Sequence, residues 1–257
     1  MASKAKRETS VEDAGSVDAE EVARFAALAD DWWDPNGRLK PLHALNPARL
    51  GFIRDQAAAH FGRDPLAANP LKGLKILDIG CGGGLAAEPL ARLGGEVLGI
   101  DAGQAAIQAA VTHAAESGVK MRYRATTAEA LLEEGAQFDL VVTLEVVEHV
   151  ADLDGFLQAA VALVAPGGAM VAATLNRTLK SFATAIVGAE YLLRWLPRGS
   201  HDWRRFVKPS ELVGKLRAEG LEVTDLAGLA YNPLTDAWRL DPQDLQVNYM
   251  LFAKRKC

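Results

Sequence analysis

Three residues whose side chains could do chemistry lie together in the stretch TLEVVEHV, Thr143–Val150. Glu145, Glu148 and His149 stand where an apolar run, expected to be a buried strand, comes to an end. If the chain turned helical at Glu145, the three side chains would stand at i, i+3 and i+4 and share one face. Such a face suits a hard divalent ion such as Mg²⁺, whereas His149 without a metal suits a general base. The alternative is a pair of solvated acids near a helix start, where the helix dipole favours them whatever the function.

A second group with chemical potential is the glycine-rich stretch LDIGCGGG, residues 77–84. Gly80, Gly82 and the glycines around them let the backbone approach a ligand, and the helix that follows offers unpaired N–H groups. Asp78 lies on the strand just before this loop, and we expect it close to the ligand. Asp101 ends the next strand, where a carboxylate can accept both hydroxyls of a ribose. Loop and distal acid together predict a nucleotide-like ligand.

The loop alone does not decide which nucleotide is bound. The dinucleotide fingerprint G-x-G-x-x-G fails when it starts at Gly80, because Leu85 takes the third glycine position. When it starts at Gly82 it matches the looser form that ends in Ala87, so an NAD(P)-dependent oxidoreductase stays open as an alternative. That alternative lacks a Tyr-x-x-x-Lys pair and a second glycine-rich half.

The elements that must position these residues alternate regularly along the chain. Strands are expected at 74–80, 96–102, 121–127, 138–146 and 169–176, and helices between them at 84–94, 105–118 and 152–168. A helix at 208–220 and strand-like runs at 221–231 and 248–256 complete the chain. Such alternation implies right-handed βαβ crossovers and an α/β fold whose sheet is covered on both faces.

The ends of the chain differ from this regular part. Residues 1–20 start basic, turn acidic and have no apolar core, so we expect a disordered tail rather than a targeting peptide. Residues 21–69 are Ala-rich and helical in pattern, interrupted by turn residues up to Pro41, and are expected to form a helical lid. The domain proper would then occupy residues 70–257, with an insertion at 179–206.

Composition narrows the function classes. The net charge is −5 and both signs are mixed along the sequence, which argues against nucleic acid as a partner. The two cysteines, Cys81 and Cys257, form no disulfide framework and no zinc pattern, so a cytoplasmic setting is expected. No run of 18 apolar residues occurs, so no transmembrane segment is expected.

The pattern D-x-G-x-G-x-G from Asp78 to Gly84, with Asp101 beyond it, resembles that of the seven-stranded S-adenosylmethionine-dependent methyltransferases. This resemblance implies a Rossmann-like, mostly parallel sheet whose last strand is antiparallel, a part that residues 248–256 could supply. The turn LVAPGG, residues 163–168, is also similar to theirs.

Further stretches resemble one subfamily, the ubiquinone-biosynthesis O-methyltransferases, which methylate polyprenylated catechol-type rings. They are WWDPNGRLKPLHALNPARLGFI (32–53), LEVVEHV (144–150), TLNRTLKS (174–181), VGAEYLLRWLPRGSHDWRRFVKPSEL (187–212) and the C-terminal YNPLTDAWRL and VNYML. The match covers nearly the whole chain apart from the tail.

The resemblance assigns roles to single residues. Residues implied to contact S-adenosylmethionine are Arg49, Gly80, Asp101 and Leu144, and residues associated with magnesium in eukaryotic relatives are Glu145, Glu148 and His149. Arg49 would pair with the methionine carboxylate of the cofactor. Trp32 and Trp33 are expected either to close over the site or to pack between helices.

The resemblance also implies an insoluble polyprenyl hydroxyphenol as the substrate. The insertion 179–206 combines apolar residues with basic flanks, so we expect it to touch the inner face of the membrane. A helix that covers the core or a dimer contact is the alternative. A catalytically silent lipid-binding scaffold in a quinone-biosynthesis complex is a third alternative, against which the intact loop, Asp101 and His149 argue.

Overall fold

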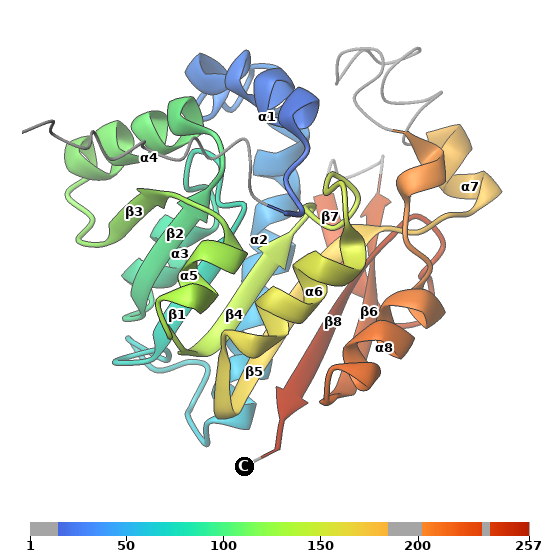
Figure 1. Ribbon diagram of the computed structural model, residues 1–257. Helices are drawn as coiled ribbons and strands as arrows, with labels where there is room; N and C mark the ends of the chain where they lie inside the picture. The colour runs from blue at the N-terminus through green and yellow to red at the C-terminus, as the bar shows by residue number, and fades with distance from the viewer. Residues whose placement is uncertain (1–14, 185–201, 233–236, 257) are drawn as a thin grey trace, which may run out of the picture.

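The computed structural model describes residues 15–184, 202–232 and 237–256. Within these residues an eight-stranded mixed sheet has the order β3-β2-β1-β4-β5-β8-β6-β7 (Figure 1). The strands are β1 (Lys75–Ile79), β2 (Glu96–Asp101), β3 (Arg122–Ala125), β4 (Phe138–Leu144), β5 (Val164–Leu175), β6 (Leu221–Asn232), β7 (Ala237–Asp241) and β8 (Asn248–Arg255).

The strand directions confirm the Rossmann-like α/β prediction. Strands β1 to β5 pair in parallel, and β8 pairs antiparallel with both β5 and β6, as expected of the last strand. The expectation of seven strands needs one correction, because β7 adds an eighth at the edge, antiparallel to β6. The five residues of β7, AWRLD, mix apolar and charged side chains and are exposed or half-buried in the structure. The sequence therefore shows no buried apolar run at this strand.

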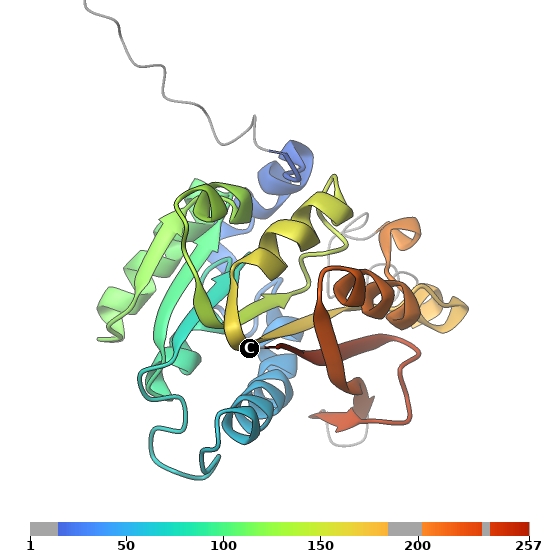
Figure 2. The ribbon, with the colours of Figure 1, turned by 60° about the horizontal axis from the view of Figure 1, so that its bottom comes forward.

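Helices cover both faces of the sheet (Figures 1 and 2). They are α1 (Ala19–Ala26), α2 (Lys40–His60), α3 (Ala87–Arg92), α4 (Gln104–Glu116), α5 (Ala128–Glu133), α6 (Leu153–Ala162), α7 (Leu179–Ser181) and α8 (Pro209–Ala218), with 3₁₀ turns η2 (Ala29–Asp31) and η4 (Trp203–Arg205). Helices α2, α3 and α4 share one apolar cluster on one face, and α5, α6 and α8 share another on the opposite face.

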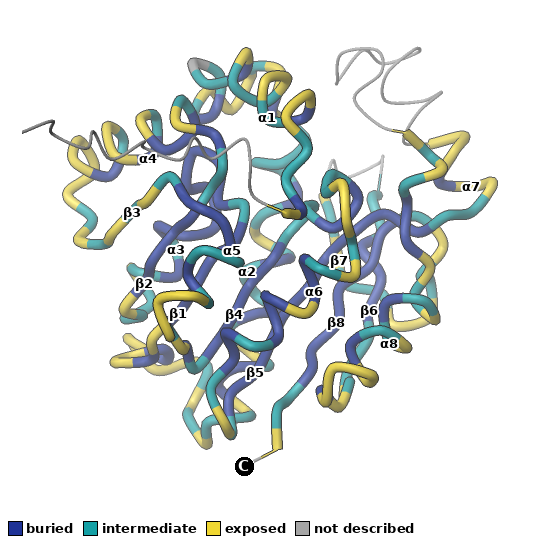
Figure 3. Tube along the Cα trace, in the orientation of Figure 1, coloured by how far each residue is buried: buried dark blue, intermediate teal, exposed yellow. Residues whose placement is uncertain are grey.

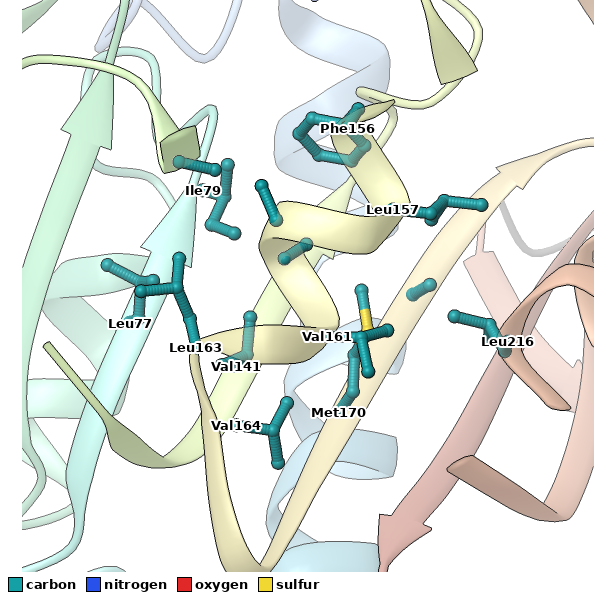
Figure 4. Close-up of a cluster of buried hydrophobic side chains, with 14 of the residues drawn as sticks. Leu77, Ile79, Val141, Phe156, Leu157, Val161, Leu163, Val164, Met170 and Leu216 are labelled. Atoms are coloured by element: carbon teal, nitrogen blue, oxygen red, sulfur yellow. The ribbon is translucent and has the colours of Figure 1, made fainter. Parts of the chain in front are cut away.

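The two apolar clusters follow from the alternation of side chains along the strands. Leu77 and Val141 face the side on which α6 contributes Phe156, as Figure 4 shows. Their sequence neighbours Ile76 and Val142 face the opposite side, toward α2. Burial on both faces, visible as the dark central strands of Figure 3, fixes the strand register. Ile79 at the end of β1 consequently lies between Ile100 of β2 and Thr143 of β4.

Two predicted boundaries near the N-terminus were wrong. Residues 15–20 are folded rather than part of a tail: Ser16 is buried, its carbonyl accepts from the Ala151 N–H at 2.8 Å, and Asp18 caps α1. The turn expected up to Pro41 ends earlier, because Pro41 stands in the first turn of α2, where its missing N–H has no helical partner to lose. Residues 1–14 lie outside the described residues.

The segment predicted as a helix over residues 152–168 divides into two elements. Asp152 accepts from two backbone N–H groups and starts α6, which ends at Ala162. Val164 already belongs to β5, so the predicted turn forms the beginning of that strand. Helix α5 was not predicted; Thr127 caps it and only six residues compose it, too few for a visible period.

The insertion predicted at 179–206 is described only at its ends, by α7 and η4, and residues 185–201 lie outside the described residues. Leu179 and Phe182 at its start are exposed. Within the described ranges no helix combines the length and apolar character that crossing a bilayer requires.

Candidate functional site

A cavity of about 260 Å³ lies at the carboxyl ends of β1, β2 and β4. Predicted residues that line it are Arg49, Asp78, Gly80, Gly82, Asp101, Leu144, Glu145 and His149. The facing wall comes from the segment that precedes and includes α1 and η2, with Glu21, Phe25 and Trp32 among the lining residues. Of the predicted site residues, only Glu148 is not part of the lining.

The glycine loop turns sharply at the end of β1. Gly80 has a positive φ of 70°, and a Cβ there would lie 2.4 Å from Val146 Cγ2, so this position requires glycine. The Asp101 carboxylate holds the loop in place, since it accepts from the Gly82 N–H at 3.0 Å and from the Gly103 N–H at 2.7 Å. These bonds place the acid of β2 beside the loop, as the sequence predicted.

Two acids, the buried Asp78 and the half-buried Asp101, give the cavity a negative character. Asp78 is buried and its Oδ2 atom has no hydrogen-bond partner within the described structure. Burial and the charge of Asp101 raise the pKa of Asp78 to about 7, although Arg49 opposes the shift. Burial also raises the pKa of Asp101, against the effect of its two backbone hydrogen bonds. A cation between the two carboxylates would relieve their repulsion.

Trp32 lies directly on the glycine loop. A Cβ at Gly82 would come within 2.2 Å of its ring, and a Cβ at Gly83 within 2.4 Å. Trp33 also contacts the glycine loop, since its indole N–H donates to the Gly83 carbonyl at 2.8 Å. Its ring stacks on His113, with 3.4 Å between the ring centroids. Both tryptophans therefore contact the cofactor side of the sheet.

Arg49 is buried on α2 and donates to Glu145 through Nη2 at 2.6 Å. Glu145 has a φ of 55°, the one positive value at a non-glycine position among the described residues, a conformation that costs about 1–3 kcal/mol. The strained backbone turns the Glu145 carboxylate back toward Arg49. Arg49, expected to bind a ligand carboxylate, thus has a carboxylate partner within the chain.

The predicted shared face of Glu145, Glu148 and His149 is wrong. Positive φ at Glu145 breaks the helical path, and residues 147–149 form a turn instead. The three side chains consequently have different partners. Glu145 pairs with Arg49, His149 faces α1, and the buried Glu148 accepts from Thr174 while its carboxyl group also lies close to that of Glu145.

Glu148 is buried, and Oε2 accepts from the Thr174 hydroxyl at 2.8 Å. Burial and the nearby charge of Glu145 raise the pKa of Glu148 well above its ordinary value, which favours the neutral acid. Across the described part of the chain, no group of three or more His, Cys, Asp or Glu side chains is arranged to hold a metal ion. The described geometry therefore does not fit the magnesium site that the resemblance implied.

His149 is held by two residues of α1 that the sequence analysis did not single out. Its Nδ1 atom lies 2.9 Å from Glu21 Oε2, and its ring meets Phe25 edge-on at 5.1 Å. In the sequence, Glu21 reads as an ordinary acid in the first turn of a helix. A separation of 128 residues leaves no sequence signal for the pair.

Buried polar atoms without a partner surround the cavity. In the described structure they include Trp32 Nε1, Arg49 Nε and Asp78 Oδ2, two donors and one acceptor. Such atoms are costly unless a ligand or water satisfies them. Donors and an acceptor around a negative cavity suit a polar ligand that carries both a cation and a carboxylate, as S-adenosylmethionine does.

The strand order with its antiparallel β8, the glycine loop and Asp101 define the class of S-adenosylmethionine-dependent methyltransferases. A family model described as a methyltransferase domain matches residues 52–226. Magnesium protoporphyrin IX methyltransferase from Synechocystis PCC 6803, solved with bound S-adenosylmethionine, has the same fold: its TM-score is 0.62 at 15% identity, over 95% of this chain and all of that one.

Curated relatives narrow the class. The ubiquinone biosynthesis O-methyltransferase of Chelativorans sp. (strain BNC1) is 55% identical over 240 residues, 93% of this chain and 94% of the relative. The enzyme of that name from Sinorhizobium medicae (strain WSM419) is also 55% identical, over 93% of this chain and 96% of its own. The chain belongs to the ubiquinone biosynthesis O-methyltransferase family.

Proposed function

We propose that the protein transfers a methyl group from S-adenosylmethionine to phenolic hydroxyls of polyprenylated catechol-type intermediates, at both O-methylation steps of ubiquinone biosynthesis. The observation that carries this proposal is the single cavity that brings the glycine loop and Asp101 together with Arg49 and His149. The names of the relatives supply the substrate class.

The cavity favours this cofactor over a nicotinamide dinucleotide. Asp78 and Asp101 face the space beside the loop, where a dinucleotide would place a negatively charged pyrophosphate. A carboxylate at Asp78 repels a pyrophosphate and attracts a sulfonium or an ammonium group, whereas Asp101 suits the ribose of either cofactor. Asp101 would accept the ribose hydroxyls, Leu144 and Gly80 would contact the cofactor, and Arg49 would take its carboxylate in exchange for Glu145.

The acceptor hydroxyl needs activation, because a free phenol has a pKa of about 10. We propose His149 as the general base, since it lines the cavity and an imidazole is the side chain best suited to accept a proton near neutral pH. His149 takes the phenol proton and later returns it to water. When bound, S-adenosylmethionine would supply an electrophilic methyl group for the phenolate oxygen, with the thioether sulfur as the leaving group. Leu144 and Trp32 line the cavity with apolar surface, which would exclude water and align the reactants.

Calorimetry and a transfer assay test this function together. S-adenosylhomocysteine should bind and NADH should not, and radioactive methyl should move from S-adenosylmethionine to a short-chain prenyl catechol. His149→Ala should lower kcat by about 10²–10⁴-fold without weakening S-adenosylhomocysteine binding. Binding of NADH alone would support an oxidoreductase instead. Cofactor binding without transfer would support a silent scaffold.

The substrate tail suggests where the enzyme works. We propose that a cytoplasmic protein touches the membrane through the insertion 179–206, because Leu179 and Phe182 at its start are exposed apolar side chains. Liposome flotation tests this with Leu179→Glu/Phe182→Glu, and Leu66→Glu, which changes an equally exposed leucine far along the chain, is the matched control. Loss of flotation in the first variant only is the expected result. Equal flotation of all three proteins would contradict membrane contact here.

A further inference from the structure

Helix α1 buries an acid where a helix usually buries an apolar residue. Of its eight residues, Glu21 is the buried one. A carboxylate removed from water is unfavourable unless it is paired, so Glu21 requires partners. It has them on both oxygens: Oε1 accepts from Arg24 Nη2 at 2.7 Å and lies 3.6 Å from Arg205 Nη1, and Oε2 meets His149 Nδ1 at 2.9 Å.

These contacts hold the pair in a defined geometry. Arg205 also pairs with Asp18 at 3.0 Å and donates to the Val150 carbonyl at 2.7 Å, so it joins the start of α1 to the turn that follows His149. Burial alone would raise the pKa of Glu21, but the hydrogen bond and charge of His149, with Arg24 and Arg205, lower it below the ordinary value. Glu21 is therefore an anion beside the imidazole.

We infer that Glu21 is the positioning residue for His149, supplied by the N-terminal segment to complete the active site. This inference rests on the proposed function of His149. With the proton on Nδ1 and bonded to Glu21, the lone pair of the ring stands on Nε2. The phenol proton moves to Nε2 while Nδ1–H stays on its nitrogen, and the carboxylate stabilises the imidazolium that forms.

Helix α1 lines the cavity and also orients the His149 ring. The Glu21 carboxylate and the Phe25 ring both come from α1 and both contact the His149 ring. Orientation of the imidazole therefore depends on α1 lying across the carboxyl end of β4. The site is complete only when the N-terminal segment is in place.

Glu21→Gln tests the inference, because glutamine keeps the size of the side chain and removes its charge. We expect kcat with S-adenosylmethionine and a short-chain prenyl catechol to fall by about 10²- to 10⁴-fold, the upper figure being the loss when the carboxylate that orients a triad histidine becomes an amide. Binding of S-adenosylhomocysteine should stay as in the wild type. Glu20→Gln, one residue away and exposed, is the matched control and should keep full activity.

A double-mutant cycle separates positioning from a general effect on folding. In a His149→Ala background, Glu21→Gln should cause no further loss, because the residue through which it acts is gone. Losses that multiply would overturn the inference, and so would equal activity of Glu21→Gln and Glu20→Gln. If His149→Ala itself were fully active, the proposed base would fail and the inference with it.

Nitrogen-15 NMR provides a second readout, and its first part uses the wild type alone. Neutral His149 should carry its proton on Nδ1, with the downfield proton signal of a carboxylate-bound N–H. Glu20→Gln should keep that signal and Glu21→Gln should lose it. A proton on Nε2 in the wild type would overturn the inference even if Glu21→Gln were insoluble.

Discussion

The buried Arg49 guanidinium and the half-buried Glu145 carboxylate form an ion pair at 2.6 Å in the lining of the cavity. One partner comes from α2 and the other from the turn after β4, 96 residues later. The pair joins the N-terminal helices to the catalytic end of the sheet. In the absence of a ligand, Glu145 thus neutralises the guanidinium that we propose to bind the cofactor carboxylate.

Loss of Arg49 should therefore affect both stability and binding. Arg49→Met leaves Glu145 without its partner, and we expect the free energy of unfolding to fall by about 3 kcal/mol. Binding of S-adenosylhomocysteine should weaken as well. Urea unfolding and calorimetry measure the two effects. A second change, Glu145→Leu, should restore stability but not binding; a double variant that binds like the wild type would contradict the assignment of Arg49.

Asp78 should make cofactor affinity depend on pH. In the folded chain its pKa is raised to about 7, and a cationic ligand favours the ionised carboxylate. Affinity for S-adenosylmethionine should therefore rise with pH and fall by up to about tenfold per pH unit below the folded-state pKa. Calorimetry between pH 6 and pH 8 checks this. Asp78→Asn should flatten the dependence, and an equally steep profile in that variant would assign it elsewhere.

The same residue should influence the stability of the cofactor-free protein. The unfolded chain releases the Asp78 proton near the ordinary value of 3.8, whereas the folded chain keeps it until about 7. Between these pH values the folded state binds more protons, so the contribution of Asp78 to stability falls as pH rises. We expect Asp78→Asn to have a higher Tm than the wild type at pH 8 and a smaller difference at pH 4. A Tm difference of the opposite sign at pH 8 would contradict the raised pKa.

Trp32 should report cofactor binding by fluorescence. Its ring lies against Gly82 and Gly83 and lines the cavity, so a ligand on the loop must change its surroundings. Titration with S-adenosylhomocysteine should shift the emission of the wild type. Trp32→Phe should lose the shift, while Trp238→Phe, on the edge strand β7, should keep it. A shift that persists in Trp32→Phe would place the ligand away from the loop.

Chelation tests the magnesium expectation. Glu145 pairs with Arg49, Glu148 with Thr174 and His149 with Glu21, so we expect methyl transfer to continue in EDTA. Glu148→Gln, which resembles the neutral acid, should lower the rate less than His149→Ala does. A rate lost in EDTA and restored by Mg²⁺ would show that these side chains rearrange around a metal.

Local pattern was enough to predict every described strand of the sheet except β7, and the position of the glycine loop beside Asp101. The alternation at Ile76 and Leu77 and the glycines after Ile79 are short-range signals, and the parallel sheet then brings Asp101 to the loop. The part of the site that comes from the N-terminal segment depends on contacts between distant segments. Trp33 meets Gly83 across 50 residues and Glu21 meets His149 across 128, and neither pair leaves a periodic trace.

The wrong expectation at Glu145 has a different cause. Residues spaced i, i+3 and i+4 share a face only on a continuous helix. The positive φ at Glu145 prevents a helix from starting there, so the three side chains do not share a face. A non-glycine residue rarely adopts this conformation, so the sequence favoured the wrong geometry. The Arg49 ion pair, which lies outside the local stretch, accompanies the strained backbone in the folded protein.

Gly83 lacks the positive φ of its neighbours Gly82 and Gly84, so its backbone would accept any residue. Only Trp32, 2.4 Å from where a Cβ would stand, excludes a side chain at this position. A side chain at position 83 therefore requires a smaller residue at position 32 or a shift of the Trp32 ring. A relative with alanine at the position of Gly83 should carry a smaller residue in place of Trp32. The requirement for glycine at positions 82 and 83 thus comes from the packing of the N-terminal segment as well as from the ligand.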